Sequence, residues 1–211
     1  MIRKYLDKLL IALGCIVIIA AVVIKFSTQY EQKKLVDNYR EYVSEMQNQD
    51  EFYNEESRKQ SDDTSQLSEP IVKSEIQNQP EEIIGILSIP KIDLTVGIGE
   101  GVDMTTLKYS VGHFPETAMP GQKGNLCLTG HRSYAFGQFF NRLDELEKND
   151  EIIIESKGNT YKYIVTETKV VKPEEVSVLD QSEDSQITLI TCTPIRVGSH
   201  RLVIKGVLMQ W

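Results

Sequence analysis

The first feature of the hydropathy pattern is an uninterrupted apolar run of 16 residues, Leu9–Ile24, with lysines at both ends, Lys8 and Lys25. A helix needs about 20 apolar residues to cross a bilayer, with about 17 as the lower limit, and the flanking lysines can reach back to water. We therefore expect residues 1–26 to anchor the chain in the cell membrane as a single-pass transmembrane helix. The basic residues that precede the run predict a cytoplasmic N-terminus and an extracellular remainder. A cleaved signal peptide is the alternative.

Residues 27–80 form a second segment, rich in Gln, Asn, Glu, Asp and Ser. Such a composition buries too little apolar surface to offset the entropy of an ordered chain. Its first half carries an apolar stripe at helical spacing, formed by Val36, Tyr39, Val43 and Met46. We expect a polar stalk with a juxtamembrane helix, which could self-associate, followed by a disordered spacer.

From Glu81 onward the pattern changes to short runs of strand-forming residues separated by Gly, Pro and Asp. We expect strands at Ile83–Ile89, Leu94–Ile98, Asn125–Thr129, Glu151–Glu155, Tyr161–Val171, Ile187–Thr191 and Leu202–Leu208. The pair Gly158-Asn159 has the chemistry of a hairpin turn. Helices are expected only at Met104–Tyr109 and Phe136–Leu146. Many short strands with few helices predict a mainly β fold, a closed or nearly closed barrel over residues 81–211.

Charge and cysteine content exclude two classes of protein. The net charge is −8, and it divides into +3 for residues 1–26, −6 for residues 27–80 and −5 for residues 81–211. An acidic chain with a pI near 5.0 argues against nucleic acid as a partner. Three cysteines allow at most one internal disulfide bond, so the chain is not a disulfide-stapled scaffold.

The candidate chemistry lies at the ends of two predicted strands. His131 follows Gly130 at the end of one apolar strand, and Cys192 ends another, just before Thr193-Pro194. Proline does not continue a central strand, so Cys192 is expected at a barrel rim. A cysteine and a histidine at one rim form a candidate nucleophile and base. The alternative is a buried structural cysteine and a capping histidine.

Arg201 opens the last predicted strand, after the loop Thr193–His200. A returning strand would bring it back near Cys192. Its permanently charged guanidinium could stabilise a thiolate and then an oxyanion. The alternative is an ordinary surface arginine.

With these residues, positions 81–211 resemble the sortases, the cysteine transpeptidases (thiol proteases in the broad sense) of Gram-positive cell surfaces. The segment Thr188-Leu189-Ile190-Thr191-Cys192 has the Thr-Leu-x-Thr-Cys pattern of that family. Gly130-His131, Ile89-Pro-Lys-Ile and Val111-Gly-His-Phe-Pro resemble further family landmarks. The resemblance implies an eight-stranded sortase-type barrel with His131, Cys192 and Arg201 as catalytic residues, without a cofactor or metal ion.

The resemblance also implies a substrate and partners. They are a sorting-signal peptide of a surface protein or pilin, with a Leu-Pro-x-Thr-Gly-like motif, and an amine acceptor from a cell-wall precursor or a pilin lysine. Cys192 would form a thioacyl intermediate, and Thr191 would contact substrate. The sequence resembles class C and class D, with roles in pilus assembly or cell-wall attachment, and does not separate them. A cysteine hydrolase and a non-catalytic anchored binding module remain alternatives.

The other polar residues near the site have plainer interpretations. We expect His113 to be structural or to line the groove from a loop. His200 should point away from the face of Arg201 because side chains alternate along a strand. Cys127 should be a packed thiol. Arg132 and Arg196 could meet an anionic group of the substrate, or be solvated loop charges.

Overall fold

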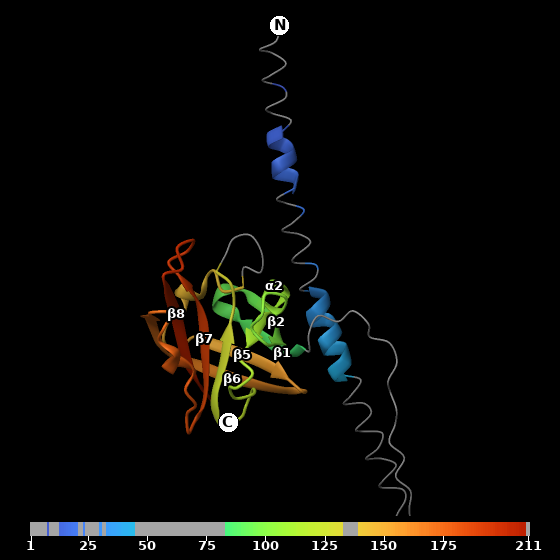
Figure 1. The fold of residues 1–211 in the computed structure, drawn as a ribbon. Coiled ribbons are helices and arrows are strands. Elements are labelled where there is room, and N and C mark those ends of the chain that lie inside the picture. Colours follow the sequence, from blue (N-terminus) through green and yellow to red (C-terminus); the bar gives the residue numbers. More distant parts are fainter. Residues whose placement is uncertain are drawn as a thin grey trace, which may run out of the picture.

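A computed structural model describes residues 8, 13–20, 23, 30, 33–44, 83–132 and 139–209. Within them eight strands close into a barrel, in the spatial order β1-β2-β3-β4-β7-β8-β6-β5 (Figure 1). The strands are β1 Ile83–Ile89, β2 Leu94–Glu100, β3 Val111–His113, β4 Gly124–Thr129, β5 Glu151–Ser156, β6 Asn159–Val171, β7 Ser185–Thr193 and β8 His200–Leu208. The short helices are η1 Pro90–Ile92, α2 Thr106–Tyr109, η2 Leu143–Glu145 and η3 Val176–Leu179. The prediction of a closed, mainly β barrel is confirmed.

The strand β3 was not predicted, because Val111–Gly112–His113 was taken for a loop. Three residues are too few to show a period of two, and glycine is depleted in strands. The structure explains the glycine, because a Cβ atom on Gly112 would lie 2.4 Å from the carbonyl oxygen of Gly101. The strand fits between β2 and β4 only without a side chain at that position.

The two predicted helices are shorter than expected. Met104–Tyr109 contracts to the four residues of α2, and the Asp103 carboxylate accepts hydrogen bonds from the backbone N–H groups of Thr105 and Thr106. In the second, residues 136–138 lie outside the described part, and turns and η2 replace a continuous helix from Phe139 onward. The described apolar positions of this segment, Phe139, Phe140, Leu143 and Leu146, are nevertheless buried. The pattern therefore identified the residues that face the core but not the backbone that carries them.

The barrel core explains why the strand predictions succeeded. β5 alternates strictly between half-exposed and buried residues, as a strand with one face on the core should. The strand β4 is buried except at its last residue, and β7 is buried over its central residues Ile187–Thr191. A second, smaller apolar cluster lies on the outer side of the sheet, formed by Val178, Ile190 and Val203.

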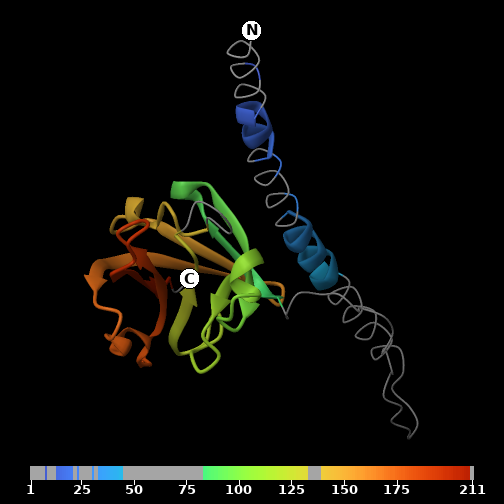
Figure 2. The ribbon, with the colours of Figure 1, turned by 45° about the horizontal axis from the view of Figure 1, so that its top comes forward.

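Residues 33–44 are helical and contact the barrel beside β1 (Figures 1 and 2). Val36 is buried, and the Tyr39 hydroxyl donates to the carbonyl of Ile84 at 3.3 Å and accepts from the N–H of Lys157 at 3.0 Å. The Arg40 guanidinium binds both carboxylate oxygens of Glu155. The predicted stripe therefore faces the barrel, and Met46 lies outside the described residues.

The predicted anchor is described only in part, at residues 8, 13–20 and 23, where the chain is helical. Among the described residues, no helix combines the length and the apolar character that a membrane crossing requires. The predicted spacer, residues 48–80, lies outside the described residues, so the boundaries of anchor and stalk stay predictions.

Candidate active site

The site is built on the parallel pair of β4 and β7. Their register joins Gly124 to Ser185 and continues step by step to Thr129 and Ile190. Parallel strands carry their C-terminal ends to the same edge. The same register, continued by two residues, sets His131 beside Cys192.

Hydrogen bonds between the residues that flank His131 and Cys192 hold the two strand ends together. One residue before Cys192 and His131, the Thr191 hydroxyl donates to the carbonyl of Gly130 at 2.7 Å. One residue after His131 and Cys192, Nη1 of Arg132 donates to the Thr193 hydroxyl oxygen at 2.7 Å. We call these two bonds the rim ties. The residues on both sides of His131 are therefore bonded to the residues on both sides of Cys192.

Packing under Gly130 fixes the exit of the chain from β4. A Cβ atom on this residue would lie 3.0 Å from the ring of Phe140, which is fully buried. The N–H of Phe140 in turn donates to the carbonyl of His131 at 3.2 Å. A side chain at position 130 would have to displace the Phe140 ring, so a glycine favours this close approach at the exit from β4.

The two cysteines of the barrel have opposite environments. Cys192 is exposed, whereas Cys127 is fully buried. Burial raises the pKa of the Cys127 thiol to about 12, so this thiol stays protonated and inert. This is the packed role predicted for Cys127, and it leaves Cys192 as the accessible thiol among the described residues of the barrel.

Arg201 lies directly across the ladder from Cys192, because β7 and β8 pair Cys192 with Arg201 and Thr193 with His200. Directly opposed residues have Cβ atoms about 4.5–5.5 Å apart and project from the same face. Nη1 of Arg201 donates to the carbonyls of Gly198 at 3.0 Å and of His200 at 3.1 Å, which turns the guanidinium toward the β7–β8 loop. His200 is exposed and, by strand alternation, lies on the opposite face, as predicted.

The small apolar cluster continues the face that carries Cys192. Ile190 lies two positions before Cys192, and Val203 lies two positions after Arg201, so all four residues share the outer face of the sheet. Asn125, which the sequence analysis did not single out, holds the loop with η3 against this face. Its side-chain N–H groups donate to two carbonyls of that loop, at 3.0 and 3.1 Å, and its oxygen accepts from Thr188.

Of the three other residues considered, Thr191 and Arg132 differ from their simplest interpretation. Thr191 is 1% exposed, and its hydroxyl is already bonded within the rim. Arg132 is buried and bonded, so it is not a solvated loop charge. Its Nη2 atom lies 2.8 Å from Oδ1 of Asp144 at η2, a partner that no sequence motif indicated. Arg196 is exposed in the β7–β8 loop, with a φ of 68°.

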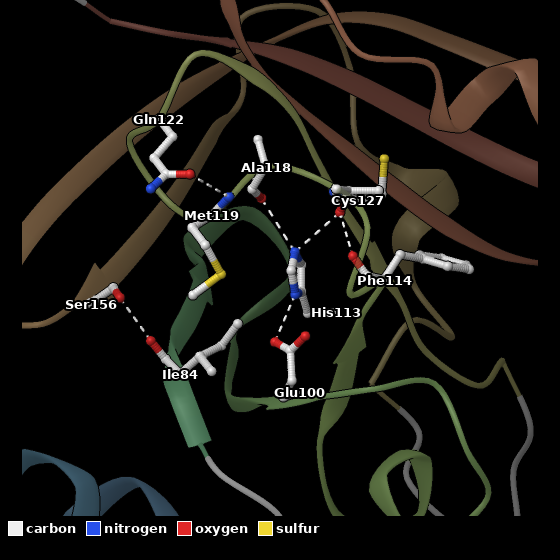
Figure 3. Close-up of polar contacts among 10 residues, drawn as sticks. Ile84, Glu100, His113, Phe114, Ala118, Met119, Gln122, Cys127 and Ser156 are labelled. Atoms are coloured by element: carbon white, nitrogen blue, oxygen red, sulfur yellow. Dashed lines mark hydrogen bonds and ion pairs between the residues drawn. The ribbon is translucent and has the colours of Figure 1, made fainter.

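His113 belongs to a network of polar contacts shown in Figure 3. Its Nδ1 lies 2.8 Å from Oε2 of Glu100, and its Nε2 lies 3.2 Å from the carbonyl of Ala118 and 3.1 Å from the hydroxyl of Thr117. Both ring nitrogens are therefore engaged by the protein. The network joins β2, β3 and the following loop, which supports a structural role, although from a strand and not from the predicted loop.

No cluster of three or more His, Cys, Asp or Glu side chains suited to hold a metal ion occurs within the described ranges. A mechanism without a metal ion or cofactor remains a prediction. The reactive groups at the rim are a thiol, an imidazole and a guanidinium. Together these can supply a nucleophile, a proton carrier and an oxyanion partner.

Comparisons with known proteins find matches over the barrel. Residues 87–209 match the family model of the sortase domain. Sortase A of Listeria monocytogenes is 30% identical over 138 residues, which cover 65% of this chain and 62% of that protein. The chain thus spans less than two thirds of that relative.

Solved structures give the same result. A sortase D5 transpeptidase of Clostridium perfringens aligns with a TM-score of 0.57 and 33% identity, over 61% of this chain and 80% of that one. A lid mutant of sortase A from Corynebacterium diphtheriae aligns with a TM-score of 0.60 and 37% identity, over 64% and 75%. A sortase C1 is similar to this chain as well, so these likenesses do not separate class C from class D.

Proposed function

Because the chain belongs to the sortase family, we propose that it is a cysteine transpeptidase that cuts a sorting-signal peptide and joins it to an amine. The observation that supports this proposal is the geometry of the rim. Its ties join the chain neighbours of His131 to those of Cys192, and β7 and β8 pair Cys192 with Arg201, which supports a common site for the three residues. Thiol, imidazole and guanidinium come from three neighbouring strands at one edge.

In the first half-reaction, the Cys192 thiolate attacks the carbonyl carbon of the Thr–Gly bond in a Leu-Pro-x-Thr-Gly-like motif. Arg201 stabilises the tetrahedral oxyanion. His131 donates a proton to the departing glycine nitrogen as the C–N bond breaks. The product is a thioacyl enzyme with a free amine released.

In the second half-reaction, an acceptor amine attacks the thioester carbonyl. His131 accepts the proton of that amine, and the Cys192 sulfur leaves as the thiolate. No net oxidation occurs, and one amide bond replaces another. The acceptor would be a cell-wall precursor or a pilin lysine, and the enzyme would be a class C or class D sortase.

We also propose that Thr191 acts by positioning and not by direct contact with the substrate. Its buried hydroxyl donates to the carbonyl of Gly130, which leaves it no free proton for a substrate group. We further propose that Leu9–Ile24 anchors the chain, with the barrel held outside the cell by the segment that follows.

The test is mass spectrometry of the protein with a sorting peptide, with and without an added amine. We expect a thioacyl adduct on Cys192, and a new amide product when the amine is present. Cys192→Ala should abolish the adduct, and the matched change Cys127→Ala should keep it. An adduct in Cys192→Ala would remove the mechanism. Release of free acid at the same rate with and without amine would indicate the hydrolase instead.

A further inference from the structure

Arg132 is buried although it follows His131 at the rim. Its side chain is 6% exposed. Taking a guanidinium out of water is costly unless good partners replace the solvent. Here Nη1 bonds the hydroxyl of Thr193, and Nη2 bonds the carboxylate of Asp144, at 2.7 and 2.8 Å. Nε is buried without a hydrogen-bond partner among the described residues.

One side chain therefore joins three segments, which are the end of β4, the end of β7 and the helix η2. Asp144 is the exposed end of this arrangement, with a side chain 55% exposed. The guanidinium is planar, so its two bonded nitrogens are fixed relative to each other. By binding Nη2, Asp144 therefore fixes the orientation of Nη1 toward Thr193. A lysine ammonium carries charge but cannot hold this geometry.

We propose that Arg132 is a positioning residue that acts through Thr193 to set the distance between His131 and Cys192. This inference rests on the proposed function. Without the Arg132–Thr193 bond, the Thr191 tie is the last bond between the two strand ends among the described residues, and the ends can separate beyond it. Proton transfer and thiol activation require hydrogen-bond distances, so the loss falls on turnover and not on peptide binding.

The sharpest perturbation is at Thr193, because it leaves the buried charge in place. Thr193→Val removes the acceptor at nearly constant shape, whereas Thr193→Ser retains the hydroxyl. A hydrogen bond to a charged group is worth about 10- to 100-fold in an equilibrium. We expect Thr193→Val to lower kcat by about 10-fold or more with KM within about twofold, and Thr193→Ser to restore most of kcat.

Arg132→Lys should resemble Thr193→Val, and the double variant should be no worse than the stronger single change, since both remove one bond. Arg142→Lys is the matched control. Arg142 caps the same helix η2, pairs with Glu145 and is half exposed, and it makes no bond to either strand end. Its kcat should be unchanged.

A second measurement needs no peptide. The rate of Cys192 alkylation by iodoacetamide is measured with and without His131→Ala, in the wild-type chain and in Thr193→Val. We expect His131→Ala to slow alkylation in the wild-type chain and to have little further effect in Thr193→Val.

The proposal is overturned if KM alone rises, which would make Arg132 a substrate contact. It is also overturned if Thr193→Ser is as damaging as Thr193→Val, or if His131→Ala slows alkylation equally in both backgrounds. If the wild-type chain forms no thioacyl adduct, the proposed function fails, while the alkylation rates still decide whether Arg132 couples the pair.

Discussion

The contrast between Cys127 and Cys192 gives a quantitative prediction. Only the thiolate reacts with iodoacetamide, so labelling depends on the thiolate fraction and on access of the reagent. Cys127 is fully buried, and burial raises its pKa from the ordinary 9.0 to about 12. Cys192 is exposed at the end of β7. We expect Cys192 to be labelled selectively in the folded barrel.

The magnitude follows from the pKa of Cys127. A rise from 9.0 to about 12 lowers the thiolate fraction about 1,000-fold at any pH below 8, because each tenfold step in the fraction corresponds to one pH unit. Restricted access adds to this factor. Cys127 should therefore react at least about 1,000 times more slowly than a free reference thiol. Its rate should rise tenfold per pH unit until the pH approaches 12, as long as the barrel stays folded.

The assay is intact-mass and peptide-level mass spectrometry of residues 81–211 after timed exposure to iodoacetamide at pH 7.5. Cys192→Ala isolates Cys127, and Cys127→Ala isolates Cys192. In urea both cysteines should react at the rate of the reference thiol, which controls for the reagent. Labelling of Cys127 in the folded Cys192→Ala barrel within tenfold of the reference thiol would refute the assignment of a buried, protonated thiol.

The remaining predictions concern the rim and the docked helix. His131→Ala should lower kcat by about 10²–10⁴-fold because it removes the proton carrier, while His200→Ala should change it little; the reverse order would show that the strand faces are misassigned. Arg201→Lys should lower kcat by about 10²–10³-fold with KM nearly constant, whereas Arg196→Lys in the exposed loop should be close to neutral. Tyr39→Phe removes two hydrogen bonds to the barrel, worth about 1–2 kcal/mol together, and should increase hydrogen exchange in residues 33–44. Tyr42→Phe, an exposed position on the same helix, should leave that exchange unchanged.

Short-range information made part of the site predictable. Cys192 and Arg201 lie on antiparallel strands joined by one loop, so an apolar run, a Pro and a second apolar run are enough to bring them back together. Because side chains alternate along a strand, the register that pairs Cys192 with Arg201 also places His200 on the opposite face. This explains why the assignment of faces at the start of β8 could be made from the sequence.

Long-range information was the missing part. β4 and β7 are parallel neighbours, and the bond from Arg132 to Thr193 spans 61 residues. No local pattern sets the register of two strands so far apart. The sequence places His131 and Cys192 at the ends of two strands on a barrel rim, and only the family resemblance implies that they meet. The sequence around Arg132 is typical of a loop, and no motif indicates Thr193 or Asp144 as a partner of its guanidinium. Its burial could be seen only in the folded chain.

The alternation of β7 explains why the rim ties do not obstruct the chemistry. Thr191 and Thr193 project from one face of the strand and Cys192 from the other, because successive side chains point to opposite sides. Thr191 faces Leu202, a core residue, and is buried with it. Cys192 faces Arg201 on the outer side. The two neighbours of the nucleophile therefore hold the strand ends from within, while the sulfur and guanidinium stay open to a peptide outside. A hydroxyl on either side of a rim cysteine is what this arrangement requires, and the sequence Thr191-Cys192-Thr193 supplies both.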